Sequence, residues 1–118
     1  MELACVAIGG ACGSLLRFIV GKWLNERHAR IIPIGTWFVN LSGAILLGVV
    51  VSAVHSPIWT VLLADGFLGA FTTFSTFMQE TFHLLVEKER KPAWIYLIGS
   101  ILTGLFGFAL GHLLGGRI

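Results

Sequence analysis

The sequence predicts an all-α membrane protein with four transmembrane helices. Of its 118 residues, 56% are hydrophobic and only 12% are charged, about half the charged fraction of a typical soluble domain. The apolar residues form four runs, each close to or above the ~20 residues that a helix needs to cross a bilayer. Short polar stretches separate the runs, so we expect one four-helix transmembrane domain, residues 1–118.

The four spans follow one another without a long linker. The first is interrupted only by Arg17, and Pro33 suits the first turn of the second, because proline is well tolerated where a helix begins. Four helices of this length enclose little space, so we expect any pore to lie between protomers of an oligomer. The expected spans are residues 3–24, 33–54, 58–86 and 92–114, and the expected loops are residues 25–30, 55–57 and 87–91.

Residues 66–77 of the third span are unlike a lipid-facing helix. Gly66 and Gly69 lie three apart, and hydroxyl residues are interleaved with Phe71, Phe74 and Phe77 after them. Glycine and threonine lower helix propensity, and Ser/Thr hydroxyls can bond carbonyls that a broken turn leaves free. We therefore expect a helix broken at membrane depth near residues 69–73, a feature that commonly builds ion sites.

Other residues inside the spans allow two interpretations. Asn40 could make an interhelical hydrogen bond or contact a ligand, and Phe74 and Phe77 could pack or line a path. A stripe of hydroxyls and small residues in the fourth span could be a wet lining or a packing face. Glycines four apart let helix backbones approach closely; they are Gly9 and Gly13 in the first span and Gly107, Gly111 and Gly115 in the fourth.

Ionisable residues inside the spans do not predict a catalytic centre. Glu80 and His83 have the spacing of a metal motif of helix bundles, but a di-metal site needs further glutamate and histidine partners on other helices, which the chain lacks. No nucleophile, base and orienting group come together in the pattern. We expect neither an enzyme nor a nucleic-acid partner.

Three stretches carry a resemblance to a known family. They are GGACGSLLRF at residues 9–18, GTWFVNLSG at residues 35–43 and GFLGAFTTFSTF at residues 66–77. Each resembles the corresponding helix of the bacterial fluoride channels (the Fluc, or CrcB, family), and the resemblance covers the whole chain. It implies a passive, fluoride-selective channel of the cell membrane that reduces fluoride toxicity, built as an antiparallel dimer with two pores.

The resemblance also implies where fluoride passes. In this family two phenylalanines turn their ring edges to the ion, an asparagine donates to it and hydroxyls continue the path. The edge of an aromatic ring is positive, and a string of modest donors lets an ion both enter and leave. The matching pore residues here are Asn40, Phe74, Ser75, Thr76, Phe77, Tyr96 and Ser100, and the matching vestibule residues are Arg17 and Glu80.

Two further implications concern a cation and the end of the path. Gly69 and Thr72 match positions whose backbone carbonyls hold a structural Na⁺ at the dimer axis, and freed carbonyls are the donors that Na⁺ takes in discontinuous helices. The family's next hydroxyl after Ser100 falls at Gly104 here. Thr103 lies beside it and is expected to face elsewhere, so whether it replaces that hydroxyl stays open.

The charges of the loops predict a preferred orientation. By the positive-inside rule, the basic first and third loops favour the cytoplasm and both termini the outside. An antiparallel homodimer needs both orientations from one chain, so the partner is either a second copy or an oppositely oriented paralogue; we favour the homodimer. The basic residues on the loop side are Lys22, Arg27, Arg30, Lys88, Arg90 and Lys91, against Arg117 on the other.

Two other classes fit the length and the number of spans. A small multidrug-resistance-type four-helix transporter can also dimerise antiparallel, but it needs a membrane-embedded carboxylate in its first helix, and Glu2 is too near the end. A purely structural membrane subunit predicts that changes at Phe74 or Asn40 alter stability alone. Fluoride flux separates both from the channel.

Overall fold

The computed structural model describes residues 1–27 and 32–117. Within these residues, four helical segments are long and apolar enough to cross a membrane, which confirms the predicted all-helical membrane fold. The molecule is 47 Å along its longest axis, more than the ~30 Å hydrocarbon core of a bilayer. The four segments are Glu2–Arg27, Ile34–Ala53, Pro57–Val86 and Arg90–Gly116.

The first and fourth spans extend further into the predicted loops than expected. Helix α1 (Glu2–Arg27) continues to Arg27, and the Arg27 guanidinium lies 4.9 Å from the ring centre of Trp23, one turn earlier. Helix α6 (Arg90–Gly116) already begins at Arg90. The remaining first-loop residues of the prediction, 28–30, lie outside the described residues, as does Ile118.

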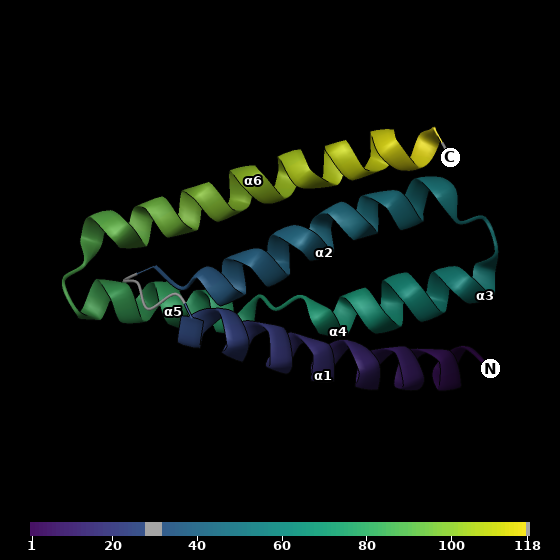
Figure 1. Cartoon of the computed structure of the whole chain (residues 1–118), viewed down its shortest axis with the longest axis horizontal. Coiled ribbons are helices and arrows are strands. Elements are labelled where there is room, and N and C mark those ends of the chain that lie inside the picture. Colours follow the sequence, from purple (N-terminus) through teal and green to yellow (C-terminus); the bar gives the residue numbers. More distant parts are fainter. Residues whose placement is uncertain (28–31, 118) are drawn as a thin grey trace.

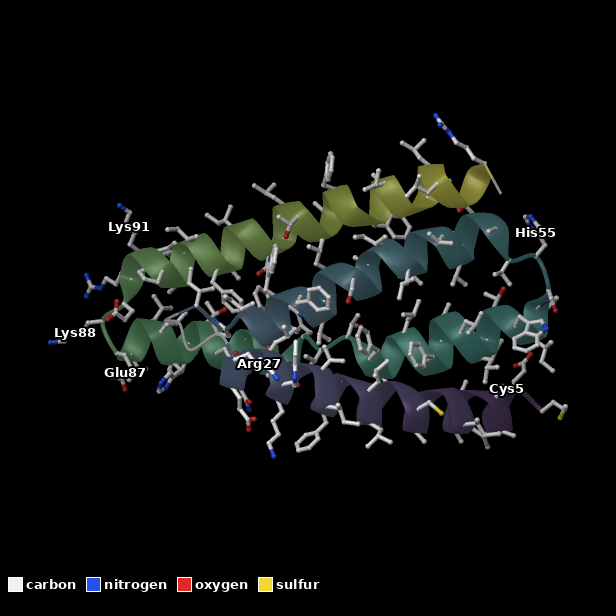
Figure 2. The ribbon with its side chains drawn as sticks, in the orientation of Figure 1. Cys5, Arg27, His55, Glu87, Lys88 and Lys91 are labelled. Carbon is white, nitrogen blue, oxygen red and sulfur yellow. The ribbon has the colours of Figure 1, made fainter. Side chains whose placement is uncertain are left out.

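The four spans alternate in direction, so the two termini lie at the same end of the molecule (Figure 1). Helix α1 and the third span run toward the α5–α6 turn, and α2 (Ile34–Ala53) and α6 run back beside each other. Glu87, Lys88 and Lys91 lie at the turn end and His55 at the opposite end (Figure 2). This arrangement agrees with first and third loops on one side of the membrane.

Helices α2 and α6 form the most extensive contact between helices, and glycines permit it. A Cβ added at Gly111 would overlap the carbonyl oxygen of Ile45, and one at Gly115 would lie 2.7 Å from the carbonyl oxygen of Val49. From the other side, a Cβ at Gly48 would lie 2.7 Å from the amide nitrogen of His112. The backbones therefore touch directly, as the glycine spacing predicts.

Helix α1 packs against the third span in the same way. A Cβ at Gly9 would lie 2.9 Å from the amide nitrogen of Phe67, and one at Gly13 would overlap the Phe67 carbonyl. A Cβ at Gly66, on the third span, would lie 3.1 Å from the backbone of Val6. In lipid, where apolar side chains gain little by leaving the solvent, such close backbone packing holds helices together.

The third span is broken, as predicted, but later than expected. It comprises α3 (Pro57–Thr60), the π-helix η1 (Val61–Leu68), α4 (Gly69–Phe71) and α5 (Ser75–Val86). Gly69 keeps helical angles (φ −60°, ψ −37°), whereas Thr72 is extended (φ −82°, ψ 158°). The irregular segment is thus 72–74, and the π-helix before it was not predicted.

Substitution of Gly111 should separate α2 from α6. Gly111→Ala places a methyl group on the Ile45 carbonyl, and such overpacking costs about 1–3 kcal/mol. We expect a lower melting temperature in detergent, measured by fluorescence-detected size exclusion. Gly116→Ala on the same helix is the control, because no atom lies within 4 Å of its added Cβ. Equal melting temperatures for the two variants would contradict the packing described above.

Candidate functional site

The side chain of Asn40 holds the break in the third span. Its Nδ2 donates to the carbonyl oxygen of Thr73 at 2.9 Å, and the Thr73 amide donates to its Oδ1 at 2.8 Å. The side chain thus pairs with both polar groups of one residue, 33 positions away in sequence. Unpaired peptide groups in the hydrocarbon region cost several kcal/mol each. Asn40 therefore makes the irregular backbone tolerable at this depth.

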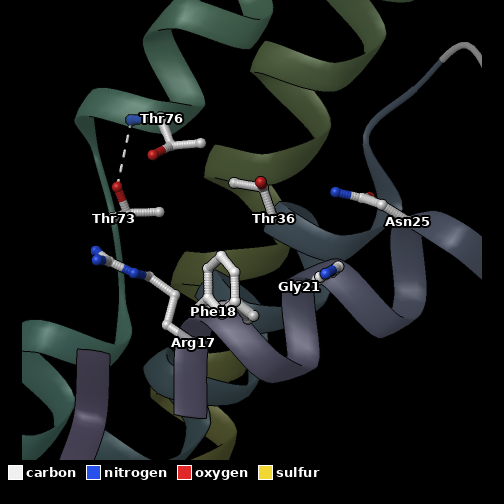
Figure 3. Close-up of a pocket in the computed structure, with 9 residues that line it drawn as sticks. Arg17, Phe18, Gly21, Asn25, Thr36, Thr73 and Thr76 are labelled. Atoms are coloured by element: carbon white, nitrogen blue, oxygen red, sulfur yellow. Dashed lines mark hydrogen bonds between the residues drawn. The ribbon is translucent and has the colours of Figure 1, made fainter. Parts of the chain in front are cut away.

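Two carbonyls lose their helical partners at the break. In an unbroken α-helix the Thr73 amide would bond the Gly69 carbonyl and the Thr76 amide would bond the Thr72 carbonyl. Here the Thr73 amide goes to Asn40, and the Thr76 amide donates to the Thr73 hydroxyl at 3.2 Å (Figure 3). Gly69 and Thr72 are the two residues that the sequence predicts as cation ligands, and both carbonyls have lost their helical partner.

Asn40 and the two phenylalanines meet at one concavity of about 230 Å³, which Thr72 and Thr73 also line. Phe77 is buried and Phe74 is 73% exposed on the surface of the protomer. The centres of their rings lie 6.3 Å apart and the ring planes cross at 62°. Three of the predicted pore residues, distant in sequence, are therefore brought together, and the concavity is open on the side of Phe74.

Tyr96 of α6 contacts Phe77, one of the residues that line this concavity. Its ring packs edge-to-face on Phe77 with centres 5.1 Å apart, and Tyr96 is only 2% exposed. The hydroxyls of Tyr96 and Ser100 are buried and have no hydrogen-bond partner among the described residues. Both residues line a second cavity, of about 280 Å³, between α2 and α6. The two hydroxyl oxygens are themselves covered in the protomer, so an acceptor from outside reaches them only when neighbouring side chains move.

The expectation that Thr103 faces away from Tyr96 and Ser100 is wrong. Thr103 lines the same cavity, because residues three and four apart share a helix face. Its hydroxyl, unlike the other two, is fully engaged: it accepts a hydrogen bond from the indole Nε1 of Trp37 at 3.1 Å and donates to the Gly99 carbonyl at 2.7 Å. The sequence analysis did not single out Trp37.

Arg17 and Glu80, the predicted vestibule residues, occupy different surroundings. Arg17 lines a pocket of about 270 Å³ that Lys22, Thr73 and Thr76 also line (Figure 3). Glu80 is absent from that lining, and its Oε1 accepts a hydrogen bond of 2.5 Å from Thr36. Thr36 lines the pocket as well, so it connects the two. Thr36 lies four residues before Asn40 and therefore on the same face of α2.

Ser75 and Thr76 lie exposed in the first turn of α5. Thr76 faces the Arg17 pocket, and neither residue lines the concavity of Asn40, Phe74 and Phe77. Within one protomer the predicted pore residues therefore do not share one cavity: Asn40, Phe74 and Phe77 line the concavity, Thr76 lines the Arg17 pocket, and Tyr96 and Ser100 line the α2–α6 cavity.

Four helical spans, a break within the third, and buried hydroxyls that lack partners in the described residues define a multi-pass membrane protein with polar groups in its interior. Residues 4–112 match the model of the family described as CrcB-like protein, Camphor Resistance (CrcB). The chain belongs to this family.

Curated relatives over nearly the full length carry one name. A protein of Clostridium acetobutylicum named fluoride-specific ion channel FluC 2 is 43% identical over 95% of this chain and 96% of its own. One of Moorella thermoacetica with the same name is 44% identical over 96% and 95%. The fluoride-specific ion channel FluC of Aquifex aeolicus is 42% identical over 93% of each chain. These relatives are named as channels and not as enzymes.

Removal of the Asn40 amide should destabilise the break. Asn40→Leu leaves the Thr73 amide and carbonyl without partners, and each unpaired buried group costs about 1–3 kcal/mol. We expect a marked fall in melting temperature in detergent. Ser42→Ala is the control, because Ser42 bonds only a carbonyl of its own helix, that of Val39. If both variants melt like the wild type, Asn40 does not hold the break.

Proposed function

We propose that this protein is a fluoride-selective channel of the cell membrane, which lets cytoplasmic fluoride leave passively and so reduces fluoride toxicity. The observation that carries the proposal is the concavity shared by Asn40, Phe74 and Phe77. An asparagine amide has two N–H donors, and the Thr73 carbonyl accepts one of them. The second is left for an ion beside the two rings. The names of the relatives support fluoride as that ion.

The donors are graded in strength along the proposed path. Ring edges are weak donors, the Asn40 amide and the free Tyr96 and Ser100 hydroxyls are stronger, and Arg17 attracts anions to one mouth. Fluoride is small and strongly hydrated, so each step must replace part of its water. Several modest sites in series allow this replacement without trapping the ion. Chloride is larger, and a narrow path with donors placed for fluoride excludes it.

A second protomer completes the proposed pores. Phe74 is 73% exposed on the protomer, and the concavity beside it is open, so an ion there needs a wall from another chain. We propose an antiparallel dimer with two pores, formed by two copies or with an oppositely oriented paralogue. The basic residues Lys88, Arg90 and Lys91 near one end favour one orientation. We favour the homodimer, with the chain inserted in both directions.

We further propose a structural Na⁺ at the two-fold axis of that dimer. Carbonyl oxygens are hard donors, and those of Gly69 and Thr72 have lost their helical partners. Gly69 is exposed on the protomer surface, where a second copy could bring its own pair. When bound, the cation would offset the negative ends of four carbonyl dipoles. The two residues would supply main-chain oxygens, so their side chains would act on the conformation only.

Fluoride flux and its dependence on the rings test the proposed function. Purified protein in liposomes should release fluoride, measured with an electrode, far faster than chloride. Phe74→Ile and Phe77→Ile keep most of the bulk and remove the positive ring edge. We expect each to lower fluoride flux at least ~10-fold, which corresponds to about 1.4 kcal/mol on the barrier, while the dimer elutes unchanged.

Phe82→Ile is the matched control, since Phe82 lies on the same helix, is 67% exposed and does not line the concavity. Comparable chloride flux in the wild type would refute the channel proposal. Drug-dependent proton uptake without fluoride flux would favour the small multidrug transporter. Unchanged flux in both ring variants would indicate that Phe74 and Phe77 serve in packing only.

Replacement of sodium tests the cation proposal. With Na⁺ exhaustively exchanged for N-methylglucamine, the wild type should lose fluoride flux or dimer stability, because uncompensated carbonyl dipoles would face one another. Gly69→Val should be more damaging than Thr72→Ser, since serine keeps the hydroxyl that bonds the Leu68 carbonyl. If neither fluoride flux nor dimer stability changes when Na⁺ is replaced, the proposed Na⁺ site is wrong. The pore assignment does not depend on it.

A further inference from the structure

The hydroxyl of Thr103 has no donor left for an anion. A threonine hydroxyl carries one proton and two lone pairs. The proton is directed to the Gly99 carbonyl at 2.7 Å, with a longer contact of 3.3 Å to the Ser100 carbonyl. One lone pair accepts the indole N–H of Trp37 at 3.1 Å. Thr103 is therefore an acceptor that fixes the indole on α2, although it lines the same cavity as Tyr96 and Ser100.

The hydroxyls of the other two polar residues that line this cavity, Tyr96 and Ser100, are unpaired in the described part of the chain. Both hydroxyl oxygens are buried, and a buried donor without a partner is destabilising. The remaining lining is mostly apolar and includes the Trp37 ring and three isoleucines. Two O–H donors without a protein partner thus belong to residues of the cavity wall, with their oxygens covered in the protomer, and the indole N–H is withheld from an acceptor there.

We propose that Thr103 is a positioning residue that holds Trp37 as a fixed wall of the α2–α6 cavity, and that the donor hydroxyls of α6 end at Ser100. The proposal rests on the proposed fluoride function. Gly104, the next position where a hydroxyl would fall, offers none, and a Cβ there would meet no atom within 4 Å. The path beyond Ser100 in this chain is therefore bounded by the indole and not by a further hydroxyl.

The physical consequence is a limit on how tightly the cavity holds an anion. An indole N–H is a good donor, and beside two free hydroxyls it would make a deeper site from which fluoride leaves slowly. Conduction needs sites that are weak enough to leave. The Trp37–Thr103 hydrogen bond removes that third donor and also keeps the ring in place.

A double-mutant cycle on fluoride flux tests the proposal. Thr103→Val keeps the shape and removes the acceptor, so the indole is released and flux should fall roughly tenfold. Thr103→Ser keeps the acceptor and should conduct like the wild type. In a Trp37→Phe background, which has no indole N–H, Thr103→Val should have no further effect. Elution as the native dimer confirms that each variant is folded.

A spectroscopic readout reports the hydrogen bond itself. The indole ¹H–¹⁵N resonance of Trp37, assigned by its loss in Trp37→Phe, should move upfield in Thr103→Val and stay in place in Thr103→Ser. In the wild type it should move on titration with fluoride and not with chloride, because the indole borders the occupied cavity.

The outcomes separate this proposal from the one on which it rests. If Thr103→Val lowers flux equally in both backgrounds, Thr103 contacts the anion directly and the proposal fails while the channel stands. Wild-type flux in Thr103→Val, or an unmoved indole resonance in that variant, also overturns it. A wild-type protein that passes no fluoride overturns the proposed function, and this proposal with it.

Discussion

The pair of hydrogen bonds between Asn40 and Thr73 is the interaction on which the interior of this protein depends. A bilayer offers no water to peptide groups, so a broken helix survives only if another part of the protein supplies the missing partners. One amide side chain supplies both an acceptor and a donor, at 2.8 and 2.9 Å. By taking the Thr73 amide it also releases the Gly69 carbonyl. A single contact thus makes the break possible and creates its chemistry.

Hydrogen bonds from the first turns of α2 also connect this helix to the other spans. The Gly35 amide donates a hydrogen bond to Asn25 of α1 at 3.0 Å. Thr36 donates to Glu80 of α5, and Trp37 donates to Thr103 of α6. Together with Asn40, these residues join α2 to each of the other three spans within six positions. Side-chain hydrogen bonds between membrane helices contribute only about 0.6–2 kcal/mol each. Their effect here is to fix the positions of the helices, while the glycine contacts bring the backbones together.

The polar groups of the interior differ in whether their hydrogen-bond donors are already paired. Protein acceptors bind the donor groups of Thr36, Trp37 and Thr103. The hydroxyls of Tyr96 and Ser100 have no partner among the described residues. Asn40 pairs with the Thr73 backbone and also lines the concavity beside Phe77. A series of incompletely satisfied groups is costly for folding, and under the proposed function a passing anion would supply the missing partners at sites that it can also leave.

The sequence by itself determined the features that depend on local composition. Hydropathy defined the four spans, the spacing of Gly107, Gly111 and Gly115 predicted the close approach of α6 to a neighbour, and the Gly/Thr-rich segment predicted a broken third helix. The resemblance of the motifs indicated the family. These predictions succeed because bilayer thickness and backbone hydrogen bonding act on each helix separately.

Only the tertiary structure decided which groups are free. The break lies at residues 72–74 and not from Gly69 onward, because Asn40 reaches Thr73 from another helix. The engagement of the Thr103 hydroxyl could not be predicted, because its neighbour Trp37 lies 66 residues away and no local pattern shows that the indole engages it. The availability of a hydroxyl or a carbonyl is set by its partner, and in this protein the decisive partners come from a different helix.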